Sequence, residues 1–374
     1  MSGGAGTAGA RIDDMEERNH MTEQGGFGVI QTAGRAERYG ERLRGLVFQF
    51  PDFERVRIPD LLFPVEHGVS PHLEALRPVY VDWLVDSKLV EPGTRVYDAV
   101  LGMKLDDCSA LINSKYGKEM VLYVAISLAL FFVLDDFMDD VEADTDKKLA
   151  YVTRLGRIAD GDAPAPEDDH ILRAWHRWFK EVESYASPQL FKLFAADLQR
   201  YVRAIRAQTL RNQSAVACAT THLMRRRDNI ACAYFMSHGA VFLQHEYGLD
   251  MVPVAEEQHV RTIIDIVAFV LVIQNDLLGL YKDVKTGEAN FVTILQREHG
   301  LGLQAACDLA GKMADDMVRS MIQMEMDLPR LIDGYEAKAD AIKQYLHIGK
   351  SLIRGTWDWY MISLRYRDEE YFSA

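Results

Sequence analysis

The fold is decided by residues 120–140, M-V-L-Y-V-A-I-S-L-A-L-F-F-V-L-D-D-F-M-D-D, in which fifteen residues broken by a single serine lead directly into four carboxylates. An apolar run of this length predicts a helix that is buried on nearly all sides. Asp135, Asp136, Asp139 and Asp140 therefore lie at the end of a core element. They repel one another at the i, i+4 spacing and face the negative end of the helix dipole.

This crowding of carboxylates calls for a cation. Clustered oxygen ligands without a neighbouring His or Cys indicate Mg²⁺, together with a phosphate. The alternative is a solvated acidic helix end, because Asp-Asp pairs are common in so acidic a chain. Four other pairs, none at the end of a comparable apolar run, are Asp13-Asp14, Asp106-Asp107, Asp168-Asp169 and Asp315-Asp316.

Composition limits the classes of partner and location. The 374 residues suffice for one large or two smaller domains, and 42 basic against 56 acidic residues give a net charge of −14. Such acidity argues against nucleic acid or an anionic membrane as the main partner. The four cysteines have no metal-ligand spacing, the longest apolar run is shorter than the roughly 18 to 20 residues that span a bilayer, and the N-terminus has no signal-peptide-like segment. We therefore expect a soluble, cytoplasmic protein without a membrane span.

The rest of the chain predicts an all-α bundle. Residues 1–35 are rich in Gly, Ala and charge and predict a flexible tail, and residues 36–374 predict one helical domain. Prolines between 48 and 71 indicate an extended strap, and Ser70-Pro71 looks like the N-cap and first turn of a helix. A loop is expected at 156–169, and further helices at 97–115, 170–211 (split at Ser187-Pro188), 217–248, 257–285, 288–298, 302–327 and 335–366, with Pro329 among the breaks.

A second polar insertion follows the apolar residues 266–273. Asn275, Gly279 and Asp283 are spaced at i, i+4 and i+8, so they share one helix face. An amide oxygen and a carboxylate, with room for a water at Gly279, form a second oxygen-ligand site, and Lys282 adds a charge for a phosphate. The alternative is an amphipathic helix that reaches the surface here. Two such insertions predict acids that face each other across the mouth of one cavity.

The strongest candidate anion site lies between these two insertions. Arg225, Arg226 and Arg227 precede Asp228 and Asn229, and guanidinium groups bind phosphate bidentately while keeping their charge. The alternative is an exposed basic turn. Near the C-terminus a late helix carries Arg354, Gly355, Trp359, Arg365 and Tyr366, which alone would indicate a surface helix.

Together these motifs resemble the class I terpene synthases of bacteria. The family's D-D-x-x-D is matched by D-D-F-M-D from Asp135, and its N-D-x-x-S-x-x-x-E by N-D-L-L-G-L-Y-K-D from Asn275. In the second motif Gly279 replaces the liganding Ser and Asp283 replaces the Glu. The N-x-V that follows this motif in the family is matched from Asn290.

Two further patterns complete the resemblance, which covers about residues 48–367. The family's diphosphate-sensing Arg, linker Asp and helix-break residue map onto Arg225, Asp228 and Asn229. Arg226 competes with Arg225, because the separation from Asn275 is a few residues longer than usual. The terminal R-G-x-x-x-W-x-x-x-x-x-R-Y is met in full by residues 354–366.

The resemblance implies the α-helical isoprenoid synthase bundle and a metal-triggered ionisation of a linear prenyl diphosphate, followed by cyclisation and release of diphosphate. It implies three Mg²⁺ ions, with Mn²⁺ as a substitute. Asp135, with or without Asp139, would hold two ions, and Asn275, Asp283 and a water at Gly279 would hold the third. The diphosphate would meet Arg225, Lys282, Arg365 and Tyr366, with Asp228 as linker and the backbone carbonyl of Asn229 contributing at the helix break.

A carbocation requires a dry apolar cavity, and aromatic faces stabilise it by about 0.5 to 2 kcal/mol each when desolvated. Core packing is the competing explanation at each position. The candidate cavity aromatics are Phe131, Phe132, Phe137, Tyr234, Phe235, Phe269 and Trp359.

Two other functions stay open at this point. A chain-elongating prenyltransferase should show a second D-D-x-x-D where this chain has N-D-L-L-G, and a catalytically inactive helical bundle would fit the Gly279 and Asp283 departures. Protonation-initiated cyclisation has no visible acid, because no D-x-D-D occurs. Farnesyl diphosphate is the favoured substrate by family frequency, geranylgeranyl diphosphate is second, and a homodimer fits the family.

Overall fold

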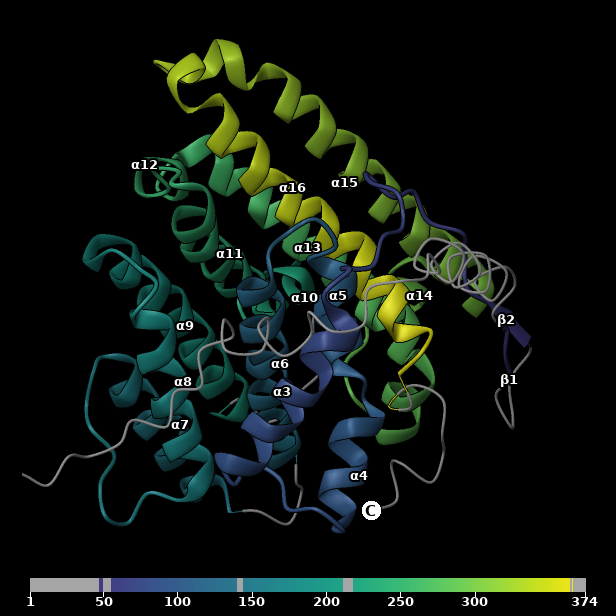
Figure 1. Cartoon of the computed structure of the whole chain (residues 1–374). Helices are drawn as coiled ribbons and strands as arrows, with labels where there is room; N and C mark the ends of the chain where they lie inside the picture. Colours follow the sequence, from purple (N-terminus) through teal and green to yellow (C-terminus); the bar gives the residue numbers. More distant parts are fainter. Residues whose placement is uncertain (1–46, 50–54, 140–143, 211–217, 364, 366–374) are drawn as a thin grey trace, which may run out of the picture.

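The computed structural model describes residues 47–49, 55–139, 144–210, 218–363 and 365 (Figure 1). These residues form helices and one antiparallel hairpin, β1 (Val47–Gln49) and β2 (Arg55–Arg57). The helices are α3 (Leu73–Asp86), α4 (Arg95–Gly102), α5 (Leu105–Ile112), α6 (Lys118–Asp139), α7 (Thr145–Ala159), α8 (His170–Glu183), α9 (Pro188–Leu210), α10 (Ala219–Arg226), α11 (Cys232–Tyr247), α12 (Val252–Ala255), α13 (Gln258–Thr286), α14 (Phe291–His299), α15 (Leu303–Leu331) and α16 (Tyr335–Tyr360). The predicted tail at 1–35, Asp140 and Tyr366 lie outside the described residues.

Helix α6 is the buried centre of the bundle, as its apolar sequence predicts. Most residues from Met120 to Leu134 are buried, and α3, α5, α8 and α11 pack around the helix (Figure 1). A helix that is apolar on all faces is stable in water only when neighbours cover all of them. The packing therefore fixes where the aspartates at its C-terminal end emerge.

Side chains from other helices hold both ends of α6. At the N-terminus, the Glu246 carboxylate of α11 accepts hydrogen bonds from the backbone N–H of Gly117 (3.0 Å) and Met120 (3.4 Å). At the C-terminus, Lys148 Nζ of α7 donates to the carbonyl of Met138 at 2.7 Å. These groups satisfy terminal backbone atoms and complement the helix dipole, so the aspartates stand on an anchored turn.

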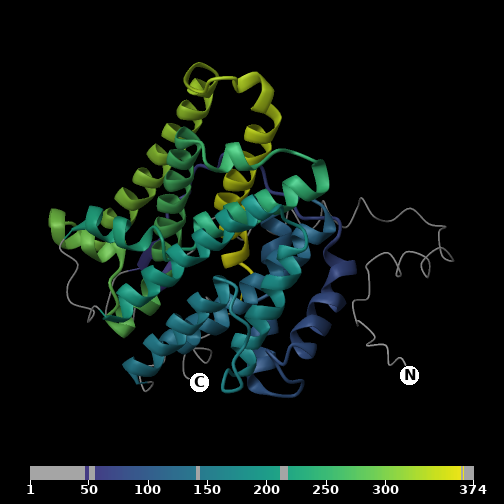
Figure 2. The ribbon, with the colours of Figure 1, turned by 90° about the vertical axis from the view of Figure 1, so that its left-hand side faces the viewer.

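Helix α13 is the second core helix, and it packs against α11, α15 and α16. The long α15 and α16 meet at the turn between them and diverge along α13 in Figure 2. Among the described residues, α6 and α13 are long and apolar enough to cross a membrane by length and composition. However, 67% and 72% of their most apolar windows are buried inside the protein, as in the core helices of a bundle.

The proline-rich strap lies over α15 and α16, as predicted, although it begins with a short hairpin that was not predicted. A Cβ on Gly311 of α15 would lie 2.6 Å from Cγ of Pro59, so glycine lets the strap lie against the helix. The Leu62 N–H donates to Asp315 at 2.7 Å, and the ring of Phe63 lies 6.1 Å from that of Trp357. The strap thus covers one side of the bundle.

Two predicted helices are each broken in the structure. The helix predicted at 97–115 divides into α4 and α5 at Lys104, and the helix predicted at 217–248 divides into α10 and α11 at Ala231. Both residues adopt left-handed backbone conformations, with φ of 55° and 58°. Non-glycine residues seldom adopt this conformation, so periodicity did not predict either break. The resemblance did place a helix break at Asn229, two residues before Ala231, and Gly102 lies two residues before Lys104.

Smaller differences concern helix ends. Helix α3 begins at Leu73 rather than at Pro71, and Ser70 Oγ accepts a hydrogen bond from the His72 N–H at 3.3 Å without capping the helix. Helix α7 continues to Ala159, so the predicted loop begins later. Pro329 lies inside α15 and does not end it. The split at Ser187-Pro188 is confirmed.

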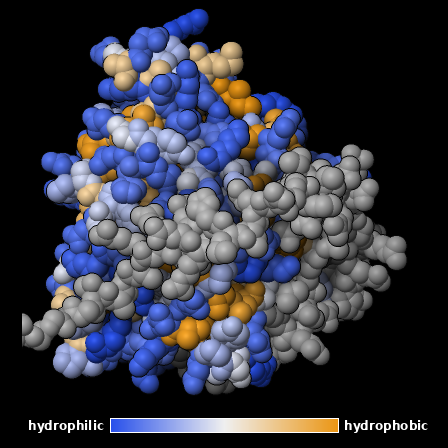
Figure 3. Space-filling view, in the orientation of Figure 1, coloured by the Kyte–Doolittle hydropathy of each residue, from blue (hydrophilic) through white to orange (hydrophobic). Residues whose placement is uncertain are grey.

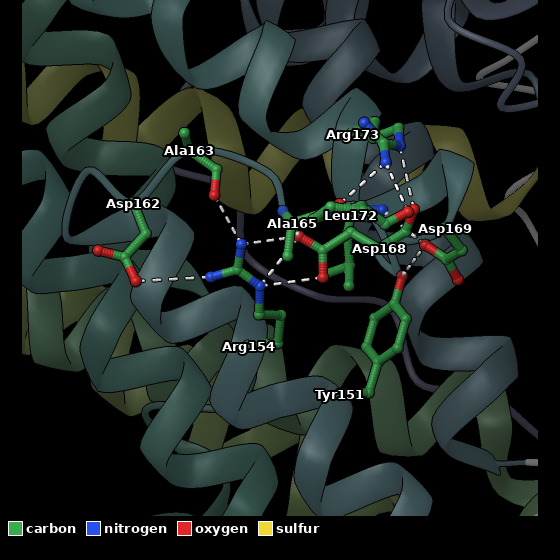
Figure 4. Close-up of polar contacts among 10 residues, drawn as sticks. Tyr151, Arg154, Asp162, Ala163, Ala165, Asp168, Asp169, Leu172 and Arg173 are labelled. Atoms are coloured by element: carbon green, nitrogen blue, oxygen red, sulfur yellow. Dashed lines mark hydrogen bonds and ion pairs between the residues drawn. The ribbon is translucent and has the colours of Figure 1, made fainter.

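Hydrogen bonds from Arg154 hold the loop between α7 and α8 (Figure 4). Arg154 of α7 donates to both carboxylate oxygens of Asp168 and to the carbonyl of Ala163. Beside it, the Asp169 carboxylate accepts from Tyr151 at 3.4 Å, and the Tyr151 ring lies 4.8 Å from that of Phe137 on α6. Helix α7 therefore supports the aspartate-bearing turn from outside.

The face shown in Figure 3 is mostly hydrophilic between scattered apolar groups, as the acidic composition predicts. Large exposed apolar side chains among the described residues include Met326 on α15, which is 68% exposed.

Gly355 lets α16 approach α5, and this contact yields a prediction about stability. A Cβ at 355 would lie 2.6 Å from the backbone nitrogen of Ile112, which cannot move independently. We expect Gly355→Ala to lower the free energy of unfolding by about 3 kcal/mol in denaturant titrations. Gly279→Ala, also within a helix but at 3.4 Å from its nearest neighbour, should keep or raise stability. Equal effects of the two substitutions would contradict this account.

His238 should make stability depend on acid. The side chain is fully buried among aromatic rings, and burial lowers its pKa from 6.5 to about 3. Below pH 6.5, His238 is protonated in the unfolded chain but stays neutral in the folded chain. The free energy of unfolding therefore falls as the pH drops below 6.5. The loss is about 2 kcal/mol at pH 5. His238→Leu should flatten the decline in melting temperature between pH 7 and 5. The control His299→Leu, at an exposed histidine, should leave that decline unchanged. An unchanged decline in His238→Leu would contradict the role given to His238.

Candidate active site

A cavity of about 340 Å³ opens where α6, α9, α10, α13 and α16 meet. Its mouth carries the acids of the first motif and the polar residues of the second. Its depth is lined by apolar side chains that include Ile112, Leu128, Leu271 and Leu352. The cavity thus combines a charged entrance with a mostly apolar interior.

The first wall is the C-terminal turn of α6, where Asp135 and Asp139 line the cavity. Arg365 donates to Asp136 at 2.6 Å and to Asp135 at 3.4 Å, and Lys282 Nζ lies 3.7 Å from Asp139 Oδ2. Desolvation at the mouth raises the pKa of Asp139 to about 6; neighbouring Asp135 adds to the effect and Lys282 opposes it. The acids are therefore crowded at the cavity, and in this structure Arg365 and Lys282 lie beside them.

The second wall is α13, where Asn275, Gly279 and Asp283 all line the cavity. Asn290 Nδ2 donates to Asp283 Oδ2 at 2.7 Å and to the carbonyl of Asp276 at 2.7 Å. Burial raises the pKa of Asp283 to about 7, with Asp276 adding to the effect and Asn290 opposing it. The shared face predicted for this motif is confirmed.

Arg226 connects the arginine cluster with the second wall. Its Nη2 donates to Asn275 Oδ1 at 2.7 Å and lies 3.7 Å from Asp276 Oδ1. The Nε atom is buried and has no hydrogen-bond partner among the described residues. Burial opposes the charge of Arg226, but Asp276, Asp283 and Asp135 outweigh burial and raise its pKa. The guanidinium therefore lies in the field of both acidic walls.

Arg225 and Asp228 do not share the contacts of Arg226. Arg225 lines the cavity but is an exposed residue without a hydrogen bond or ion pair to the described part of the chain. Asp228 accepts hydrogen bonds from Arg200 at 2.8 Å and from Arg227 at 3.1 Å, and it does not line the cavity. Of the two candidate arginines, Arg226 is the one that contacts the second wall in this structure. The predicted linker Asp228 contacts Arg200 of α9.

The predicted cavity aromatics divide into two groups. Four line the cavity: Phe131, Phe132, Phe235 and Trp359. The other three do not, which corrects the prediction. Phe137 packs on Tyr151 outside the cavity, Tyr234 is fully buried in the aromatic core beside Trp178, and Phe269 packs in a second core with α14 and α15. Asn229 lines the cavity, with its side chain bonded to Gln208.

Several lining residues were not singled out from the sequence. Tyr360 accepts a hydrogen bond from Asn275 Nδ2 at 2.9 Å, Tyr201 packs on Phe131 at 4.5 Å, and Glu288 lies at the mouth. His222 also lines the cavity. The sequence could have indicated this residue only through its spacing, because it lies four residues before Arg226 and so on the same helical face.

The donor set at the mouth fits a hard divalent cation. Both walls offer carboxylate or amide oxygens, and two of the carboxylates have raised pKa values that a cation would offset. Within the described ranges, no three His, Cys, Asp or Glu side chains form one compact cluster. The oxygen donors are instead divided between two facing walls.

Comparison with known proteins agrees with this site. The family model "Terpene synthase family 2, C-terminal metal binding" matches residues 127–320. A sesquiterpene synthase, Agr8, of Cyclocybe aegerita is 22% identical over 327 residues, 85% of this chain and 88% of the relative. The 7-epi-alpha-eudesmol synthase of Streptomyces viridochromogenes, a farnesyl diphosphate cyclizing enzyme, is 22% identical over 318 residues, 81% of this chain and 90% of the relative.

Solved structures show the same fold. The linalool/nerolidol synthase from Streptomyces clavuligerus, in complex with 2-fluorogeranyl diphosphate, superposes with a TM-score of 0.69 at 18% identity over 81% of this chain and 98% of that chain. An a-eudesmol synthase has a TM-score of 0.69 at 19% identity, over 82% and 99% of the two chains. The predicted isoprenoid synthase bundle is thus confirmed.

The chain belongs to the class I terpene synthase family, as the motifs indicated. The metal-binding description of the family model implies dependence on a divalent metal.

The two neighbouring arginines should differ in their effect on catalysis. Arg226→Gln removes a charge held between both walls, so we expect turnover of prenyl diphosphate to fall at least about 100-fold. Arg225→Gln removes an exposed charge and should change turnover by less than about fivefold. Steady-state assays of released diphosphate measure both. The reverse order would mean that Arg225 turns inward to serve the reaction.

Proposed function

We propose that this enzyme ionises a linear prenyl diphosphate with Mg²⁺, cyclises the carbocation and releases diphosphate, with farnesyl diphosphate as the favoured substrate. The observation that carries the proposal is the cavity itself, in which two oxygen-donor walls face each other across the mouth of an apolar interior. Such a mouth suits a metal diphosphate, and such an interior suits a hydrocarbon chain.

The residues of the two walls would share the metal ions. Asp135 and Asp139 would hold ions on the α6 side, and Asn275 and Asp283 would hold an ion on the α13 side. Mg²⁺ keeps several waters, so a water in the space beside Gly279 can take the place of a serine hydroxyl. When bound, the ions supply charge neutralisation of the leaving diphosphate.

Cationic side chains around the mouth would receive the diphosphate. Arg226 offers its Nε, which has no hydrogen-bond partner within the described ranges, and Arg225 also lines the cavity. Lys282 and Arg365 pair with Asp139, Asp135 and Asp136 in this structure. If these carboxylates held metal ions, Lys282 and Arg365 would be released to bind phosphate oxygens. Tyr366 stays a prediction, since it lies outside the described residues.

The interior would protect and guide the cation. Phe131, Phe132, Phe235 and Trp359 present aromatic rings to the cavity, and Phe132 also lies 4.9 Å below the guanidinium carbon of Arg365. Aromatic faces stabilise a desolvated cation by about 0.5 to 2 kcal/mol each. The carbonyl of Asn229, at the break between α10 and α11, stays a candidate to direct the developing charge.

The names of relatives support farnesyl diphosphate as the substrate. Two of them are named as farnesyl diphosphate cyclizing enzymes. The cavity, at about 340 Å³, lies within the range of about 300 to 1,000 Å³ that ligand pockets cover. A cytoplasmic location and a homodimer remain our expectations for this family.

The proposal is tested by incubating the purified protein with Mg²⁺ and, separately, with geranyl, farnesyl or geranylgeranyl diphosphate. We expect gas chromatography with mass spectrometry to find a cyclic sesquiterpene from farnesyl diphosphate. Asp135→Asn should abolish product at unchanged melting temperature, because it removes a metal-facing charge, and EDTA should do the same.

Two outcomes would replace the proposal. Longer prenyl chains formed on addition of isopentenyl diphosphate, without cyclic product, would establish a prenyltransferase. No diphosphate release from any substrate would establish an inactive bundle. A cyclic product from geranylgeranyl diphosphate alone would keep the cyclase and correct the chain length.

A further inference from the structure

A buried pair, His222 of α10 and Asp276 of α13, stands behind the arginine that faces the cavity. His222 Nε2 and Asp276 Oδ2 are 2.6 Å apart, and both side chains are nearly inaccessible, at 3% and 2% exposure. The same Asp276 oxygen accepts the N–H of Phe291 at 2.7 Å. One carboxylate thus joins α10, α13 and the start of α14.

The other oxygen of Asp276 faces Arg226. The Arg226 Nη2 lies 3.7 Å from Asp276 Oδ1 and donates to Asn275 Oδ1 at 2.7 Å. A buried carboxylate without partners is costly, so its position is set by the donors that surround it. His222 and the Phe291 N–H hold one oxygen in place, which leaves the second to orient the guanidinium.

We propose that His222 is a positioning residue, which acts through Asp276 to aim Arg226 at the diphosphate. The inference rests on the proposed function, because it presumes that Arg226 binds diphosphate. Arg226 is one of three successive arginines, and its neighbour Arg225 is exposed. Both arginines line the cavity, but the side chains of adjacent helical residues point about 100° apart, so the rotation of α10 decides which of them reaches Asn275 and Asp276. The bond from His222, one helical turn before Arg226, fixes that rotation.

The test compares two amides at position 222. His222→Gln carries an N–H donor at nearly the place of Nε2 and keeps the bond to Asp276, whereas the shorter His222→Asn cannot reach it. Binding of inorganic pyrophosphate in Mg²⁺, measured by calorimetry, should weaken about tenfold in His222→Asn. In His222→Gln it should stay within about threefold of the wild type.

A double-mutant cycle separates positioning from general damage. In an Arg226→Gln background, His222→Asn should weaken pyrophosphate binding by no more than about twofold, since the group it positions is gone. His238→Asn is the matched control, because it alters a buried histidine that has no hydrogen-bond partner in the part of the chain that the structure describes. Its effect on binding should be small in either background.

Several results would overturn the inference: equal weakening by Asn and Gln, a full loss of affinity from His222→Asn in the Arg226→Gln background, or wild-type binding in His222→Asn. The proposed function can fail independently of it. If the wild type yields no cyclic product and yet binds pyrophosphate with the expected pattern, the positioning role stands and only the cyclase reaction is withdrawn. A wild type that binds no pyrophosphate overturns both.

Discussion

The structure depends on one constraint, which is that two apolar helices end in oxygen ligands at the same place. Helix α6 must be surrounded because it is apolar on all sides, and the apolar stretch 266–273 of α13 is largely buried for the same reason. Burying both in one bundle brings Asp135 and Asp139 into the lining of the same cavity as Asn275 and Asp283. The packing that stabilises the bundle therefore also gathers carboxyl groups whose pKa values are raised by burial.

The remaining elements keep those two ends aligned. Lys148 anchors the last turn of α6, and Asn290 bonds to both the backbone and a carboxylate of α13. Helix α16 approaches α5 closely at Gly355, and Trp359 Nε1 donates to the carbonyl of Met103 at 2.6 Å. This packing leads the chain back across the cavity, where Arg365 meets the first acidic wall.

The sequence predicted the elements with the strongest patterns. It did not predict features that depend on how each helix is rotated about its axis. Long apolar runs followed by acids were sufficient to locate α6, α13 and the two facing walls. Periodicity did not predict the breaks at Lys104 and Ala231, where non-glycine residues adopt left-handed conformations, and only the resemblance indicated the second one, at Asn229. Spacing alone could not choose between Arg225 and Arg226, nor tell cavity aromatics from core aromatics, because tertiary packing sets which way a helix face points.

The two departures from the second motif are best understood together. A Cβ at Gly279 would lie 3.4 Å from Asp283 Oδ2, an ordinary contact, so space does not force a glycine there. The substitution removes a hydroxyl donor without changing the shape of the wall. The shorter acid at 283 keeps its hydrogen bond to Asn290, and burial still raises its pKa to about 7. The wall therefore keeps a carboxyl group whose charged form a bound cation would favour, and under the proposed function a water in the adjacent space would replace the missing neutral ligand.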